Sequence, residues 1–244
     1  MERWDRTRDV EETSLAALVE RGDRRTFLKW SGALAAVTAI GCEDSPLAPA
    51  RELPVAFDHE SNGQSCAPVT LDFANDLGVL NYAYALEQLE AAFYIQVVSP
   101  FYRGVNGREE RLLIDLRAHE IVHREFFRAA LGANAIPDLC FDFSRIWFNA
   151  RGSVLGYAKL FEDLGVMAYN GAAPYLQNPL FLLTAGKIVS VEARHASALR
   201  DVLLPNGRSF APDAFDAKLR PAAVLQAASK FVENPINLIN VPVF

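Results

Sequence analysis

Two Glu-x-x-His sequences constrain the fold of this chain more than any other feature. Glu120 is followed by His123, and Glu192 by His195, in a sequence that contains only four histidines. Residues three positions apart lie on one face of an α-helix, so each pair can direct a carboxylate and an imidazole at the same point. A single pair of this kind is as easily explained by a helix surface, and two pairs must be read together with the residues around them.

Four segments carry apolar residues at alternating steps of three and four, which predicts four amphipathic helices. They cover residues 71–98, 108–131, 153–170 and 180–204. Each apolar stripe contains a glutamate near its middle, namely Glu87, Glu120, Glu162 and Glu192. A carboxylate buried on such a stripe is costly unless it is paired or bound to a cation. The converging glutamates and histidines therefore predict a metal site.

The pattern predicts an all-α fold in which residues 70–204 form a four-helix bundle. Glycine and proline residues separate the helices. The segment between the second and third helices, residues 133–152, is long enough to cross the bundle, so these two helices are predicted to be parallel. Residues 205–244 are predicted to form a fifth helix, over 212–232, and an extended tail that docks on the bundle.

Residues 1–42 are predicted to be an export signal and not part of the fold. Arg24 and Arg25 precede Phe27, Leu28 and Lys29, and a short uncharged run follows. This run is too short for a membrane-spanning helix, which needs about 20 residues. The pattern resembles a twin-arginine (Tat) signal. The Tat route carries folded proteins, which suits a protein that is loaded with metal before export.

The end of this signal resembles a lipobox, because Ala39, Ile40 and Gly41 precede Cys42. The first of these positions favours leucine, so lipidation of Cys42 is left open. Residues 43–69 are predicted to be a flexible tether, and His59 within it is expected to be solvated. The mature protein is expected in the periplasm or cell envelope, with membrane contact only through a lipid on Cys42.

The charge and the remaining cysteines narrow the function further. A formal charge of -6 and a pI near 5.3 argue against nucleic-acid binding, which needs a basic surface. Cys66 and Cys140 remain in the mature chain. Outside the cytoplasm they could form a disulfide, and two unpaired cysteines are the alternative.

The order of the ionisable residues resembles that of the ferritin-like dinuclear carboxylate proteins. In that family one Glu from each of two helices joins a Glu-x-x-His from each of the other two. Leu80 and Asn81 before Glu87, with Tyr94 after it, look like the first helix of bacterioferritins. Residues 162–174 are similar to a bacterial subgroup described as ferritin-like or desiccation-related.

The resemblance implies a centre of two iron or two manganese ions. Its protein ligands would be Glu87, Glu120, His123, Glu162, Glu192 and His195. Glu120 and Glu192 would bridge the ions, and the other two glutamates would each bind one ion together with one histidine. Carboxylate and imidazole ligands suit iron or manganese, and the stripes carry no cysteine that would favour structural zinc.

The implied activity is redox chemistry on O2 or peroxide, as a ferroxidase, a peroxidase or a catalase-like enzyme in oxidative stress. The alternative is a non-catalytic, desiccation-related or stress-related envelope protein whose metal site is structural or sequesters metal. In bacterioferritins a methionine directly after the ligand glutamate of the second helix binds haem. Ile121 takes that position here, so no haem is expected. Whether the chain forms a homodimer is left open.

Four residues near the ligands have alternative interpretations. Glu90 follows Glu87 by one helical turn and could replace it as a ligand or act as a base. Tyr94 is the catalytic candidate. Tyr94 and Tyr169 lie on the stripes and could donate hydrogen bonds to ligands or serve as ordinary core aromatics. His119 lies to one side of the site and is expected to support a ligand or to face solvent.

Overall fold

The computed structural model describes residues 66–241, and all of them belong to one compact unit, Ser61–Phe244. The predicted export signal, Cys42, His59 and most of the predicted tether lie outside the described residues. The described residues form five α-helices and one sheet of two strands. The predicted all-α class is therefore confirmed, with a small parallel sheet as an addition.

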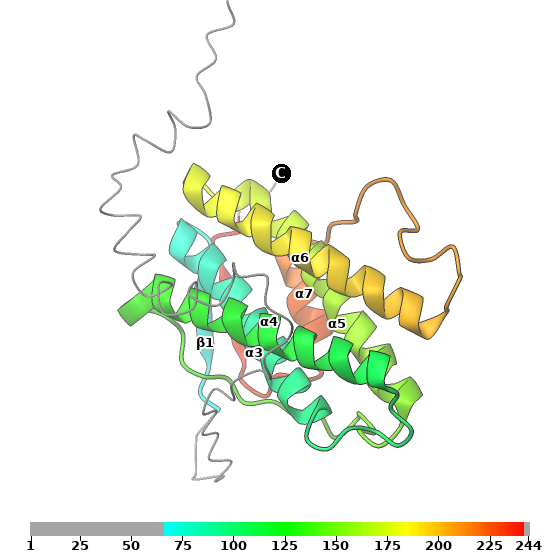
Figure 1. Ribbon diagram of the computed structural model, residues 1–244. Helices are drawn as coiled ribbons and strands as arrows, with labels where there is room; N and C mark the ends of the chain where they lie inside the picture. Colours follow the sequence, from blue (N-terminus) through cyan, green and yellow to red (C-terminus); the bar gives the residue numbers. More distant parts are fainter. Residues whose placement is uncertain (1–65, 242–244) are drawn as a thin grey trace, which may run out of the picture. The chain divides into compact units, whose positions relative to one another are not determined.

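Four long helices make up the bundle (Figure 1). They are α3 (Asp76–Val97), α4 (Gly107–Leu131), α5 (Arg151–Ala172) and α6 (Pro179–Leu203). Asn75, Asn106 and Asn178 each precede a helix and accept hydrogen bonds from its first free N–H groups. Gly132 ends α4 at a φ of 53°, a conformation that favours glycine. These local signals explain why the observed ends lie close to the predicted ones.

The directions of the helices follow from their contacts. The hairpin between α3 and α4 makes these two antiparallel. Tyr94, late in α3, contacts Glu162, early in α5. Glu87, earlier in α3, contacts Tyr169, later in α5. Both α4 and α5 thus run antiparallel to α3, and they are parallel to each other. This arrangement is the one predicted from the long connection between them.

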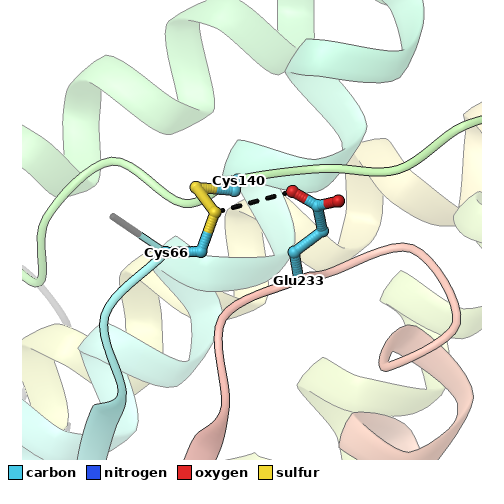
Figure 2. A group of neighbouring side chains, drawn as sticks. All are labelled: Cys66, Cys140 and Glu233. Carbon is cyan, nitrogen blue, oxygen red and sulfur yellow. Dashed lines mark hydrogen bonds between the residues drawn. A yellow bond between two sulfur atoms is a disulfide. The ribbon is translucent and has the colours of Figure 1, made fainter. Parts of the chain in front are cut away.

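The crossover between α4 and α5 is fastened to both ends of the described chain (Figure 2). Cys140 forms a disulfide with Cys66, with the Cα atoms 5.7 Å apart, and Glu233 lies beside the bridge. The backbone N–H of Glu233 donates to the carbonyl of Cys140 at 3.0 Å, and Asn234 accepts from the N–H of Cys140 at 2.6 Å. Of the two alternatives for the cysteines, the structure therefore has the disulfide.

The flanks of the bundle differ from the sequence expectation in two places. The end of the predicted tether and the first two residues of the predicted first helix form strand β1 (Val69–Asp72), which pairs in parallel with β2 (Ile236–Ile239). The predicted fifth helix over 212–232 is shortened to α7 (Pro221–Ala228). Pro221 begins this helix and disfavours helical geometry at Arg220 before it, and the N–H of Leu219 donates to the carbonyl of Met167 on α5 at 3.0 Å.

Aromatic side chains fill the core beside the four glutamates. Phe93 of α3 meets Phe161 of α5 edge to face, with ring centroids 5.0 Å apart. Phe231, after α7, packs on the same Phe161 at 4.9 Å. Such aromatic pairs contribute about 0.5–1.5 kcal/mol beyond the burial of their surface. Phe161 directly precedes Glu162, so this packing holds the α5 backbone at the position of a predicted ligand.

Candidate metal centre

The structure brings all six predicted ligand residues together inside the bundle. Glu87 comes from α3, Glu120 and His123 from α4, Glu162 from α5, and Glu192 and His195 from α6. The side chains of the four glutamates are fully buried, and the two histidines are nearly so, at 9% and 6% exposure. On α4, α5 and α6 the amphipathic period turns these residues toward the core with the apolar stripe. The first helix was also predicted to be amphipathic, but α3 is buried on almost all sides, as expected for a central helix that is apolar all round.

Two overlapping groups of potential ligand atoms lie within this cluster. The first consists of Glu87, Glu120, His123 and Glu192, and the second of Glu120, Glu162, Glu192 and His195. Within each group, one atom from every residue lies within 4.8 Å of the others. Glu120 and Glu192 belong to both groups. The cluster can therefore offer two neighbouring cation positions that share two carboxylates.

In each group, the histidine turns its Nδ1 atom to the carboxylates. The Nδ1 of His123 lies 3.0 Å from Glu192 and 3.4 Å from both Glu87 and Glu120. The Nδ1 of His195 lies 3.0 Å from Glu120 and 3.1 Å from Glu162. Both rings thus present the same nitrogen to the point where the carboxylate oxygens converge.

Several buried oxygen atoms of the cluster make no hydrogen bond. They are Oε2 of Glu87 and both carboxylate oxygens of Glu120 and of Glu192. A buried acceptor without a donor typically costs about 1–3 kcal/mol, and more when it is charged. Cations at the two positions would satisfy these oxygens, so the residues fit a pair of metal ions.

The electrostatics of the cluster are those of a site that exchanges protons for metal. Burial raises the pKa of Glu87 to about 8, and that of Glu162 well above its usual range. Burial opposes charge on Glu192 as well, but the contacts with His123 and His195 outweigh it and lower the pKa of Glu192 to about 2. Burial would lower the pKa of His195, yet its contacts with Glu120, Glu162 and Glu192 raise it to about 12. Metal binding would therefore release protons.

Two tyrosines orient the glutamates that belong to only one group. Tyr94 on α3 donates to Oε1 of Glu162 at 2.6 Å, and Tyr169 on α5 donates to Oε1 of Glu87. Each tyrosine lies seven residues after the ligand glutamate of its own helix and donates its hydrogen bond to the ligand glutamate of the opposite helix. In both cases Oε2 of the glutamate is left to face the histidine. Both tyrosines therefore contact a predicted ligand, and Tyr169 is the counterpart of the catalytic candidate Tyr94.

Glu90 is buried beside the cluster but belongs to neither group. A Cβ atom added to Gly165 would lie 3.1 Å from Oε1 of Glu90 and 3.6 Å from Oε2 of Glu192. Gly165 on α5 thus provides the space that the Glu90 carboxyl group occupies, a role that its position in the sequence did not reveal. Burial raises the pKa of Glu90 well above its usual range and thus favours its neutral form.

His119 touches the cluster from outside. Its Nδ1 lies 2.8 Å from Nε2 of His195, and the two rings are stacked. His119 is exposed and lies on α4, while its partner lies on α6. His119 is thus exposed, as one of the two alternatives predicted, and it also contacts the predicted ligand His195 on another helix.

Comparisons with known proteins agree with this geometry. Residues 75–205 match the ferritin-like domain, and residues 23–41 match the Tat pathway signal sequence. A comparison with curated proteins finds no match. Within residues 66–241, no helix combines the length and the apolar character needed to span a bilayer. The matched domain covers more than half of the chain and all six clustered residues, so the chain belongs to the ferritin-like family and carries a Tat signal for export across the cytoplasmic membrane.

Proposed function

We propose that the cluster holds two iron or two manganese ions and that the exported protein uses them for redox chemistry on O2 or peroxide. The observation that carries this proposal is the pair of ligand groups that share Glu120 and Glu192. Shared carboxylates keep two ions close together, as a two-electron reaction requires. The remaining glutamate and histidine of each group would bind one ion only.

The donor set supports iron or manganese over other metals. It consists of carboxylates and imidazoles, which suit these ions, whereas soft metals and structural zinc favour thiolates. When ionised, the four glutamates carry the negative charge that balances two divalent cations. A buried cluster of this charge is costly without cations, so the fold and the proposed centre support each other.

The chain's own residues would set the conditions for this chemistry. If the six residues hold two iron or manganese ions, the site would gain the capacity for two-electron chemistry on O2 or peroxide. Tyr94 and Tyr169 hold Glu162 and Glu87 in orientation. Burial, together with the contact with Glu162, raises the pKa of Tyr94 well above its usual range, so this tyrosine keeps its proton and acts as a donor. We propose that the function of Tyr94 is this hydrogen bond to Glu162.

A second candidate function follows from the burial of the carboxylates. All four glutamates are at 0% exposure, which is also expected for a closed site that only stabilises the bundle or sequesters metal. The two functions differ in whether a small molecule reaches the ions. Azide added to the metal-loaded protein should change its visible absorption if the centre is catalytic, and should leave it unchanged if the site is closed.

The first experiment is elemental mass spectrometry on the mature protein, purified from its own host without chelators. Two iron or two manganese ions per chain are expected, and peroxide consumption by this sample should scale with its metal content. The Glu120→Gln/Glu192→Gln variant should retain almost no metal, because each replaced side chain serves both positions. Two ions per chain in that variant, or no iron and manganese in the wild type, would contradict the proposal.

A further inference from the structure

The two ligand groups have the same kinds of residues but differ at the outer nitrogen of one histidine. Each group has one histidine with Nδ1 toward the carboxylates and one glutamate held by a tyrosine from the opposite helix. His195 has a further contact, because its Nε2 lies 2.8 Å from Nδ1 of His119. Among the described residues, nothing forms a comparable hydrogen bond with the Nε2 of His123.

The direction of this hydrogen bond follows from the role of the inner nitrogen. Nδ1 of His195 faces Glu120 and Glu162 and needs its lone pair to bind a cation. The neutral ring then carries its proton on Nε2, so Nε2 donates and Nδ1 of His119 accepts.

The contact also restricts how the His195 ring can turn. The rings of His119 and His195 have centroids 5.1 Å apart and planes inclined by 14°, so they are stacked as well as hydrogen-bonded. Partners at the outer nitrogen of a ligand histidine fix its tautomer and orientation, and their loss typically lowers metal affinity by about 10–100-fold. His119 reaches His195 from a different helix, and therefore also ties α4 to α6 at this point.

We propose that His119 is a positioning residue for one of the two metal positions. Through His195 it makes the position formed by Glu162 and His195 the tighter one, and it makes the two positions inequivalent. Because His119 is exposed and contacts His195, the His119 side chain lies between this tighter position and the solvent. The inference rests on the proposed function, since it requires that both positions bind ions.

The test is an anaerobic titration of the metal-free mature protein with Mn(II), followed by calorimetry. Wild-type protein should bind two ions. His119→Phe keeps an aromatic ring but removes the acceptor, and should weaken one ion by about 10–100-fold. His119→Gln places an acceptor near the same point and should recover much of this loss. The matched control is Val122→Ala, because Val122 is 45% exposed on α4 and should not affect either ion.

Two background variants assign the effect to one position. In Glu87→Gln only the position of Glu162 and His195 should remain, and adding His119→Phe should weaken it. In Glu162→Gln the other position should remain, and His119→Phe should have no effect. Equal weakening of both ions, or unchanged binding in His119→Phe, would overturn the role of His119. A wild-type protein that binds no Mn(II), Fe(II) or other divalent ion would instead overturn the proposed function.

Discussion

Glu87 and Glu90 lie one helical turn apart on α3. Replacing each in turn by glutamine tests which of the two binds metal and which is only a buried neighbour. Oε2 of Glu87 faces His123 at 3.4 Å within the first ligand group, whereas Glu90 is in neither group. We therefore expect Glu87→Gln to bind one ion fewer than the wild type, and Glu90→Gln to bind two. The exchange changes neither size nor shape, so the two variants control for each other.

The structure also predicts how these variants affect stability. With a pKa of about 8, Glu87 is protonated at pH 7 before metal binds, so glutamine replaces a neutral group. The melting temperature of the metal-free protein should then stay within about 2 °C, equivalent to about 0.5–1 kcal/mol. An ion supplied at 100 times its Kd stabilises the native state by about 2.7 kcal/mol. Loss of one ion should remove about 5–10 °C of the stabilisation that Mn(II) provides.

The assay combines metal content with thermal unfolding, each measured with and without Mn(II). The assignment of Glu87 would be refuted if Glu87→Gln retained two ions and the full stabilisation. If Glu90→Gln lost an ion while Glu87→Gln did not, Glu90 would be the metal ligand in place of Glu87. A fall in the melting temperature of both metal-free variants would refute the inference that both side chains are neutral.

Three further predictions concern stability. Gly171→Ala should destabilise the fold, because its Cβ would lie 1.7 Å from the carbonyl oxygen of Leu219, although alanine is usually the better helix former. Gly186 has open space around it, so Gly186→Ala should raise the free energy of unfolding, measured in urea, by about 0.5–1 kcal/mol. Cys140→Ser should lower the free energy of unfolding by about 4 kcal/mol, since the disulfide spans 74 residues, and a reductant should then have no further effect. The metal-free protein should lose stability as pH rises from 5 to 8. The pKa of Glu87 is about 8 in the folded state and 4.5 in the unfolded state, so in this range the folded state holds a proton that the unfolded state has released. Thermal melts of Glu87→Gln should show a smaller loss of stability over the same range.

The ligand cluster could be predicted because its signal is local. A glutamate in the middle of an apolar stripe is visible within one helix, and the cost of burying it requires partners from other helices. The tyrosine contacts were only partly predictable. The spacing of Tyr94 and Tyr169 was visible, but which glutamate each one reaches depends on how α3 and α5 pack.

The parts that sequence reasoning missed depend on pairing between distant residues. Val69 pairs with Ile236, and no local pattern in either segment indicates the other. The fifth helix was predicted to start too early, although Pro221, which begins α7, is a residue that favours the first position of a helix. Similarly, the partner of His119 lies on another helix, and its distance became known only with the fold.

The disulfide at the edge of the domain determines where a mechanical load would enter it. Cys66 lies near the C-terminal end of the predicted tether, residues 43–69, and it is bonded to the crossover at Cys140. A pull on the preceding chain therefore reaches the crossover and the loop of Glu233 before it reaches β1 or α3. The disulfide thereby divides the load between the crossover and the strand that leads to α3, the helix that carries Glu87. Because a disulfide forms most readily outside the reducing cytoplasm, we expect this sharing of the load only after export through the Tat route.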